Sequence, residues 1–455
     1  MRTLAEFLSI LAQGVTGPSE GGSAHEPANS AVRSAVYAAV ALVAIASGVG
    51  VLTKLVRIPY TVALVLAGLG LALLRTPISG AHITEELVLL IFLPPLLFQA
   101  GLHLDLKELR RNWVAVSALA VPGVVLTTAA AALATRWLLP SAVPGQYANW
   151  VTALVLGAVV APTDPISVVA IFRSLGVPKQ LRLLVEGESL FNDGTAAALF
   201  GVLKTALVAG AAAGAAGAAS SGSSNPDVIG TAIQFFKVVG IGGGVGLGMA
   251  AAAYFVLCRL NDHTLETGIT VGLAWGSFLV AEWAKGSGVI AVVAAGLVIG
   301  NFGTRFAMSA ETRTTLRGFW DSVDFIVNSI VFLLVGLELS DPELGGVGRL
   351  VSWPVLASAG AVYGALLIAR AVKVVIVAGV SPAHWPKRWN WVIWWAGLRG
   401  GLSLALALGL PTVEVRRHLV PVVFLIVLAT LILQATSMPK VIKLSGASGP
   451  PDTEE

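Results

Sequence analysis

Two carboxylates and two further polar side chains interrupt an apolar run at residues 187–194, which read Gly-Glu-Ser-Leu-Phe-Asn-Asp-Gly. In a helix, Glu188 and Asn192 share one stripe, because they are four residues apart. Ser189 and Asp193 share the adjacent stripe for the same reason. An ionisable side chain in hydrocarbon loses much of its hydration energy unless it is paired, so such residues in a membrane helix mark a pathway or a binding site. The segment therefore predicts an oxygen-rich edge on an apolar helix.

A proline lies on each side of Thr163 and Asp164, in the sequence Ala-Pro-Thr-Asp-Pro at 161–165. Proline removes backbone hydrogen bonds, so we expect the helix to open here near the middle of the membrane. The released carbonyl groups and the Asp164 carboxylate would then face a water-accessible cavity, close to Asp193 on the next span. The alternative is a kinked helix in which Asp164 forms a structural salt bridge. The consecutive positions of the two aspartate-bearing spans favour the cavity.

An arginine stands between glycines at residues 396–401, which read Ala-Gly-Leu-Arg-Gly-Gly inside another apolar run. We expect this run to be interrupted as well. An arginine in a membrane span needs an anionic partner, because burial of its charge alone is costly. Glu188 is the candidate partner for Arg399.

The candidate ligands are all oxygen atoms: the carboxylates of Asp193 and Asp164, the hydroxyls of Ser189 and Thr163, and main-chain carbonyls. Hard cations such as Na⁺ bind such ligands, whereas Zn²⁺ or Cu²⁺ would require His or Cys. A desolvated carboxylate binds its proton more tightly, which brings its proton affinity toward physiological pH. Na⁺ and H⁺ would then compete for Asp193. A carrier that crosses only when this charge is neutralised must exchange one ion for the other.

The composition predicts an all-α polytopic membrane protein. The 455 residues are 56% hydrophobic and 12% charged, with a mean hydropathy of +0.83, whereas soluble domains carry about 25% charged residues. The formal net charge of +4 comes from Lys and Arg in short connections, so we interpret it as topology information and expect no nucleic-acid partner. The single cysteine excludes an intramolecular disulfide framework. We expect the lipid bilayer as the partner, and no cofactor.

Thirteen segments are candidate membrane spans, since a span needs roughly 20 apolar residues. Connections after odd-numbered spans hold more Lys and Arg than the others, so the positive-inside rule places the N-terminus outside and the C-terminus in the cytoplasm. The predicted location is the cytoplasmic membrane. The predicted spans are residues 34–53, 58–75, 86–103, 113–139, 149–172, 183–209, 228–258, 264–283, 287–303, 318–339, 352–380, 390–410 and 419–438.

The two interrupted segments fall in the fifth and the twelfth span, which cross the membrane in opposite directions. Each is the fifth span of a six-span block if the seventh span is a connector. This pattern is typical of two inverted repeats. Paired broken helices in corresponding positions of two halves indicate a transporter whose substrate site lies near the midplane, where half-helix ends and released carbonyls meet.

Three segments of low complexity have other predicted roles. Residues 14–30, rich in Gly, Ser, Pro and Asn, are expected to be disordered. Residues 209–226, rich in Ala, Gly and Ser, form either a flexible outer linker or an extension of the sixth span. Residues 242–248 contain five glycines and superficially resemble a nucleotide-binding loop. No strand is expected before them, so close packing of helices is the favoured interpretation.

Five stretches carry a specific resemblance: Thr-Asp-Pro at 163–165, residues 183–194, Ser-Gly-Val-Ile-Ala at 287–291, Phe-Leu-Leu-Val-Gly-Leu-Glu at 332–338 and Gly-Leu-Arg-Gly at 397–400. Together they resemble the NhaP-type sodium/proton antiporters. These belong to the first monovalent cation:proton antiporter family and are relatives of the animal sodium/hydrogen exchangers. The similarity runs from about the second span to the thirteenth.

The resemblance implies a homodimer of thirteen-helix protomers with the NhaA/NhaP-like antiporter fold. Spans one to three and eight to ten would form a dimerisation domain, and spans four to six and eleven to thirteen a core that carries the ion in an elevator-like movement. The implied division is residues 1–33 as a flexible N-terminal segment, 34–112 and 264–339 as the dimerisation domain, 113–209 and 352–438 as the core, 210–258 as linker and connecting span, and 439–455 as a short cytoplasmic tail.

The same resemblance implies roles for particular residues. Asp193 would be the essential carrier of the cation and the proton, and Asp164, Ser189 and the main chain at Thr163 would be further Na⁺ ligands. Asn192 would join Glu188 and Arg399 in a structural polar network. Electrogenic relatives have a second aspartate where this chain has Asn192, which indicates electroneutral one-for-one exchange. Many relatives have an acidic residue where this chain has Gln99, so a difference in pH response or ion access is expected there.

Other functions are weighed against Na⁺/H⁺ antiport. K⁺/H⁺ antiport by the same mechanism is the main alternative, because the ligand types do not separate K⁺ from Na⁺ or Li⁺. An intramembrane aspartyl protease would also use two membrane aspartates, but its Tyr-Asp and Gly-x-Gly-Asp settings surround neither Asp164 nor Asp193. A passive channel has no need of two opposed broken helices and a neutralising arginine. We therefore expect a transporter and not an enzyme.

Overall fold

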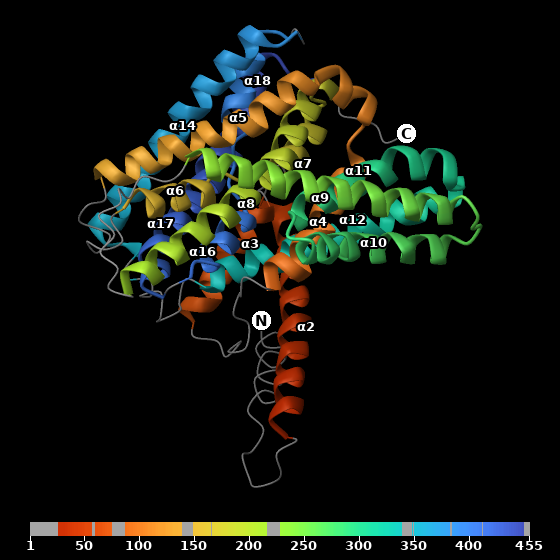
Figure 1. Ribbon diagram of the computed structural model, residues 1–455, viewed down its shortest axis with the longest axis horizontal. Coiled ribbons are helices and arrows are strands. Elements are labelled where there is room, and N and C mark those ends of the chain that lie inside the picture. Colours follow the sequence, from red (N-terminus) through yellow and green to blue (C-terminus); the bar gives the residue numbers. More distant parts are fainter. Residues whose placement is uncertain are drawn as a thin grey trace.

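The computed structural model describes residues 26–56, 60–74, 87–138, 149–164, 166–215, 228–338, 348, 350–382, 385–411 and 413–449. Within these ranges the regular structure is helical and no strand occurs (Figure 1). Eight of the described helices are long and apolar enough to cross a membrane, and three shorter apolar helices accompany them. The predicted all-α polytopic architecture is confirmed, whereas the count of thirteen membrane crossings stays a prediction.

The described helices vary widely in length. Continuous helices are α2 (Glu26–Val56), α3 (Tyr60–Leu73), α5 (Leu106–Leu138), α8 (Lys179–Ala215), α9 (Val228–Leu257), α10 (His263–Trp283), α12 (Ala310–Leu337) and α14 (Trp353–Val380). Helices that change pitch along their length are η1 (Leu87–Phe92) with α4 (Leu93–His103), α11 (Gly288–Val298) with η3 (Ile299–Ala307), and α17 (Val413–Ala429) with η6 (Thr430–Ala435) and α18 (Thr436–Ser445).

Two helices are broken at the positions that the sequence predicts. The first pair is α6 (Trp150–Val159) and α7 (Ile166–Ser174), and the second is α15 (Trp389–Trp395) and α16 (Gly401–Leu408). Residues 161–164 and 397–400 between the halves have no regular structure. Proline explains the first break, because it cannot donate a backbone hydrogen bond. Glycines flank the second break, where they lower the cost of leaving helical geometry.

Side-chain caps explain where several helices begin. Asn149 accepts a hydrogen bond from the Thr152 main-chain N–H at the start of α6, and Ser287 accepts one from Ile290 at the start of α11. Asp262 caps α10 from the preceding connection. Hydrogen bonds from the main-chain N–H groups of Leu265 and Thr264 hold the pKa of Asp262 below its usual range.

Small residues allow several helices to pack closely. Gly68 of α3 meets Gly336 of α12, where an added Cβ would overlap main-chain atoms of the other helix. Gly242 and Gly246 of α9 similarly face the main chain of Ser287 and the start of α11. The glycine-rich stretch therefore packs helices, as predicted, and forms no nucleotide-binding loop.

Helix α5 packs against α6, α8 and α14, while α3 packs on α12 and α4 packs on α11. These two sets meet along α8, which contacts α4 and α11. Figure 1 shows α2 projecting away from the remaining helices. The assignment of the two sets to a core and a dimerisation domain stays a prediction.

The structure changes three predicted boundaries. Residues 26–30 begin α2, so the prediction of disorder for 14–30 is wrong there, and residues 14–25 lie outside the described ranges. Residues 209–215 continue α8, which agrees with the alternative of an extended sixth span. Helix α18 continues into the predicted tail at 439–455. It ends at Ser445, because the next residue, Gly446, adopts a left-handed conformation.

Candidate functional site

Asp193 lies on α8 beside the first helix break. Its Oδ1 accepts a hydrogen bond of 3.1 Å from the Thr163 main-chain N–H. The carboxylate lines a cavity of about 90 Å³, together with Asp164 and Thr163 from the break. Asp324 and Asn328 of α12 line the same cavity. The break in α6 and α7 thus brings main-chain and side-chain groups to the polar stripe of α8.

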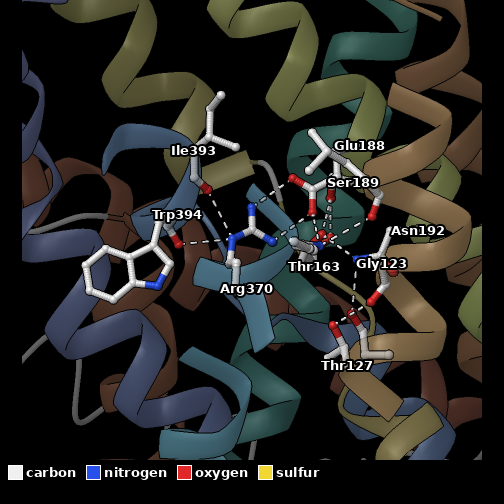
Figure 2. Close-up of polar contacts among 12 residues, drawn as sticks. Gly123, Thr127, Thr163, Glu188, Ser189, Asn192, Arg370, Ile393 and Trp394 are labelled. Carbon is white, nitrogen blue, oxygen red and sulfur yellow. Dashed lines mark hydrogen bonds and ion pairs between the residues drawn. The ribbon is translucent and has the colours of Figure 1, made fainter. Parts of the chain in front are cut away.

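Ser189 and Asn192 attach α8 to the first break (Figure 2). The Ser189 hydroxyl donates to the Thr163 carbonyl, and the Thr163 hydroxyl donates to Ser189 Oγ over 3.2 Å. Asn192 Nδ2 donates to the Ala161 carbonyl and to Thr163 Oγ1, both at 3.0 Å. The four predicted ion ligands, Asp193, Asp164, Ser189 and Thr163, therefore lie together. A cation that took both Ser189 Oγ and the Thr163 carbonyl as ligands would replace the hydrogen bond between them.

The two helix breaks contact each other directly. The Asp164 main-chain N–H donates to the Leu398 carbonyl over 2.8 Å. Gly400 lies against Asp164, where an added Cβ would be only 2.5 Å from the Asp164 Cβ. Glycine is required at this close approach because any side chain would displace the aspartate. Broken helices from distant parts of the sequence therefore cross at the candidate ion site, as predicted for paired breaks.

Arg399 binds main-chain carbonyls and not the predicted carboxylate. Its guanidinium donates to the Pro162 carbonyl over 2.9 Å and also to the Ala161 carbonyl. These carbonyls follow the last turn of α6, where a helix leaves unsatisfied acceptors and carries partial negative charge. The predicted pairing of Arg399 with Glu188 is wrong, because the anionic partner of Arg399 is the carboxyl end of a half-helix.

Glu188 is bound by two cations of α14. Arg370 forms two parallel hydrogen bonds of 2.8 Å to its carboxylate oxygens, and Lys373 Nζ lies 2.6 Å from Oε1. All three side chains are almost completely buried. Arg370 also donates to the carbonyls of Ile393 and Trp394 at the end of α15, each at 3.0 Å. Figure 2 shows Arg370 between Glu188 and these two carbonyls.

The two arginines therefore have parallel tasks. Arg399 caps the carboxyl end of α6, and Arg370 caps the carboxyl end of α15. Each places positive charge at the negative end of a half-helix dipole. The predicted network of Asn192, Glu188 and Arg399 is divided into two parts: Asn192 and Arg399 share the Ala161 carbonyl, while Glu188 belongs to the pair of cations on α14.

The sequence-based prediction missed Arg370, Lys373 and Asp324. The first two lie in the predicted span at 352–380, and Asp324 in the span at 318–339. All three are ionisable residues within apolar runs, which is the same feature that distinguishes residues 187–194. Asp324 Oδ1 accepts a hydrogen bond of 2.8 Å from Asn328 Nδ2, four residues farther along α12.

Gln99 lies outside the lining of this cavity. Its side-chain amide donates to Asp321 Oδ1 over 3.3 Å, and His103 Nε2 lies 3.5 Å from the same oxygen. Asp321 is largely exposed, so these contacts form at the edge of the protein and not beside Asp193. An accessory role of Gln99 stays a prediction.

The group of oxygen atoms around Asp193 differs from a multivalent metal site. Among the described residues, no group of three or more His, Cys, Asp or Glu is arranged to hold a metal ion. Two carboxylates, two hydroxyls and main-chain carbonyls offer hard oxygen ligands instead. Such a set suits a cation that binds and leaves again.

The sequence matches the family model described as "Sodium/hydrogen exchanger, transmembrane" over residues 38–444. The chain belongs to this family. The chain is similar to the Na⁺/H⁺ antiporter ApNhaP of Aphanothece halophytica, which is 36% identical over 398 residues, covering 86% of this chain and 71% of that protein. The Na⁺/H⁺ antiporter NhaP of Pseudomonas aeruginosa is 33% identical over 424 residues, covering 88% and 95%.

A solved structure supports the fold. The sodium proton antiporter MjNhaP1 from Methanocaldococcus jannaschii, at pH 8, superposes with a TM-score of 0.70 over 91% of this chain and 100% of that chain. The two sequences are 19% identical in this comparison. The predicted NhaP-like antiporter fold is therefore confirmed.

Proposed function

We propose that this protein exchanges Na⁺ for H⁺ across the membrane by competition of the two ions for Asp193. The observation that carries the proposal is the setting of this carboxylate: it faces a cavity at the crossing of two broken helices and accepts a hydrogen bond from Thr163 N–H. In the described part of the chain no Lys or Arg forms an ion pair with it. A carboxylate in such a site gains from binding either Na⁺ or H⁺. The names of the relatives support Na⁺ and H⁺ as the ions.

Asp193, Asp164, Ser189 and Thr163 are the proposed Na⁺ ligands. Asp164 and Asp193 supply charge, and the hydroxyls of Ser189 and Thr163 supply neutral oxygens. Family membership supports a transporter over an intramembrane aspartyl protease. K⁺ is the alternative cation, and Li⁺ would be accepted with Na⁺, because the ligand types are common to all three.

Exchange is proposed to be electroneutral, one Na⁺ for one H⁺. Asn192 is neutral and its amide is used in hydrogen bonds to the first break. Only one side chain at this point of α8 therefore changes charge when the ion is exchanged. The loaded forms with Na⁺ and with H⁺ have the same charge, so a complete cycle moves no net charge.

Alternating access is proposed to follow an elevator-type movement of the predicted core, residues 113–209 and 352–438, which holds both breaks. The homodimer, the division into dimerisation and core domains, and the orientation with the N-terminus outside and the C-terminus in the cytoplasm belong to the same proposal. The location would be the cytoplasmic membrane, and the biological role pH homeostasis. The packing of two helix sets along α8 supports a boundary at which such movement could occur.

The test uses purified protein in proteoliposomes with an imposed pH gradient. Addition of Na⁺ is expected to collapse the gradient, and comparison with Li⁺ and K⁺ decides the cation. Asp193→Asn is expected to remove exchange. Asp262→Asn is the matched control, because this exposed carboxylate caps α10 and asparagine is an equally good cap. Full exchange by the Asp193→Asn variant would refute the proposal.

Electroneutrality is tested separately in the same proteoliposomes. An applied membrane potential that changes the exchange rate at fixed Na⁺ and H⁺ gradients would refute electroneutral exchange.

A further inference from the structure

Lys373 is a second cation on a carboxylate that already has a complete partner. Arg370 binds both oxygens of Glu188, and Lys373 Nζ approaches one of these oxygens at 2.6 Å. We propose that Lys373 is a positioning residue that supplies the balancing positive charge for the ion site and so weakens the binding of the transported cation. The inference rests on the proposed function of Asp193.

The environment of Lys373 shows that its charge is held in place. Its side chain is only 4% exposed. Besides Glu188, its ammonium group donates to the Leu119 carbonyl of α5 over 3.4 Å. Gly123 of the same helix makes room for it, since an added Cβ there would lie 3.1 Å from Lys373 Cδ. A lysine enclosed in this way cannot move its charge to solvent, as an exposed lysine would.

The net charge of the groups around the ion site determines the effect of Lys373 on cation binding. The positive groups are Arg370 and Lys373 on α14 and Arg399 in the second break; the negative groups are Glu188 and Asp193 on α8 and Asp164 in the first break. Asp324 of α12 also lines the cavity and adds a fourth negative group. These seven charges sum to −1 when all the carboxylates are ionised. One bound Na⁺ or H⁺ raises the sum to 0.

Without Lys373 the same region would carry −2 when empty and −1 when loaded. The additional net negative charge would make the site hold its cation more tightly. Lys373 contacts Glu188, and Asp193 is five residues beyond Glu188 on α8, a rise of about 7.5 Å. At a separation of roughly 10 Å and an effective dielectric constant of about 20, one unit charge changes a binding constant about tenfold.

Tighter binding is not an advantage to a carrier, because the cation must also leave on the other side. A site surrounded by four carboxylates and only two cations would release its ion slowly. Lys373 therefore adjusts affinity to allow turnover. A purely structural lysine would change the stability of the protein or its maximal rate and would leave the affinity for Na⁺ unchanged.

The experiment measures the half-saturating Na⁺ concentration of exchange in proteoliposomes, at one neutral pH for all variants so that Lys373 keeps its charge. Lys373→Gln keeps a hydrogen-bond donor for Glu188 but removes the charge, and Lys373→Met is the second neutral variant in case one of them does not fold. Lys373→Arg keeps the charge. Lys237→Gln, an exposed lysine of α9, is the control for loss of a positive charge elsewhere.

We expect the half-saturating Na⁺ concentration to fall about tenfold in each neutral variant and to stay at the wild-type value in Lys373→Arg and Lys237→Gln. An unchanged or raised value in a folded neutral variant would overturn the inference, as would the same decrease in Lys373→Arg. Absence of Na⁺-driven proton movement in the wild-type protein would instead refute the proposed function, so the two failures are distinguishable.

Discussion

Glu188 and Asp193 are five residues apart on one helix, yet their surroundings are opposite. Glu188 is fully buried and held by Arg370 and Lys373, with three short contacts that satisfy its oxygens. Asp193 faces a cavity and accepts a hydrogen bond from a main-chain N–H. A carboxylate that is already neutralised by fixed cations has little to gain from a mobile one, whereas Asp193 has much to gain. The comparison assigns structure to the first and ion exchange to the second.

The same contrast extends to the polar groups around each carboxylate. Those around Glu188 are charged and come from α14, and they also secure the end of α15 through Arg370. Those around Asp193 are hydroxyls and main-chain groups of the first break. Ser189 and Thr163 are hydrogen-bonded to each other, and a bound cation can take the place of these hydrogen bonds. Four variants test this division.

Asp193→Asn is expected to have the largest effect on transport, a decrease of at least about 100-fold in exchange, since removing a charge from a polar site is worth several kcal/mol. Its folded state should survive, because asparagine can still accept the hydrogen bond from Thr163. Thermal unfolding in detergent measures this. A lower unfolding midpoint than wild type would show that Asp193 also has a structural role and would weaken the comparison.

Glu188→Gln is expected to have the largest effect on stability. It leaves two buried cations without their carboxylate, and breaking a buried ion pair in this way costs about 3–5 kcal/mol. Reduced yield and a clearly lower unfolding midpoint are the expected results. Glu188→Gln protein with wild-type stability and altered ion selectivity would reverse the roles that we assign to the two carboxylates.

Asn192→Asp is expected to have an intermediate effect. The Asn192 amide donates to the Ala161 carbonyl and to Thr163 Oγ1, and an ionised aspartate cannot donate. We expect a loss of about 1–3 kcal/mol in stability and slower exchange. Asn192→Ala removes the donor without adding charge. The difference between the two variants therefore measures the effect of the added negative charge on stability and exchange. Equal behaviour of both would show that charge at this position does not influence the site.

Ser189→Ala is expected to have the smallest effect. It removes one hydroxyl that contacts Thr163, a loss of about 1 kcal/mol. We expect the half-saturating Na⁺ concentration to rise about fivefold, with little change in the maximal rate. Ser322→Ala on α12, at an exposed position, should leave both values unchanged. An unchanged half-saturating concentration in Ser189→Ala would remove this hydroxyl from the proposed ligands.

The sequence alone determined where the helices break and which helix carries the polar stripe. Proline and glycine act on their own neighbours in the chain, so the interruptions at 161–165 and 396–401 could be predicted without tertiary information. A run of four polar residues inside an apolar segment is equally visible. The candidate ion ligands followed, because they lie in or beside these two features.

Only the tertiary structure decided which charges meet. Glu188 and its partners Arg370 and Lys373 are 182 and 185 residues apart in the sequence, and no local pattern specifies such a pairing. Arg399 was assigned the wrong partner because its acceptors are carbonyls at the end of α6, whose availability depends on the crossing of the two breaks. A buried charge takes whichever opposite charge or dipole the packing brings within reach, and packing is a property of the assembled helices.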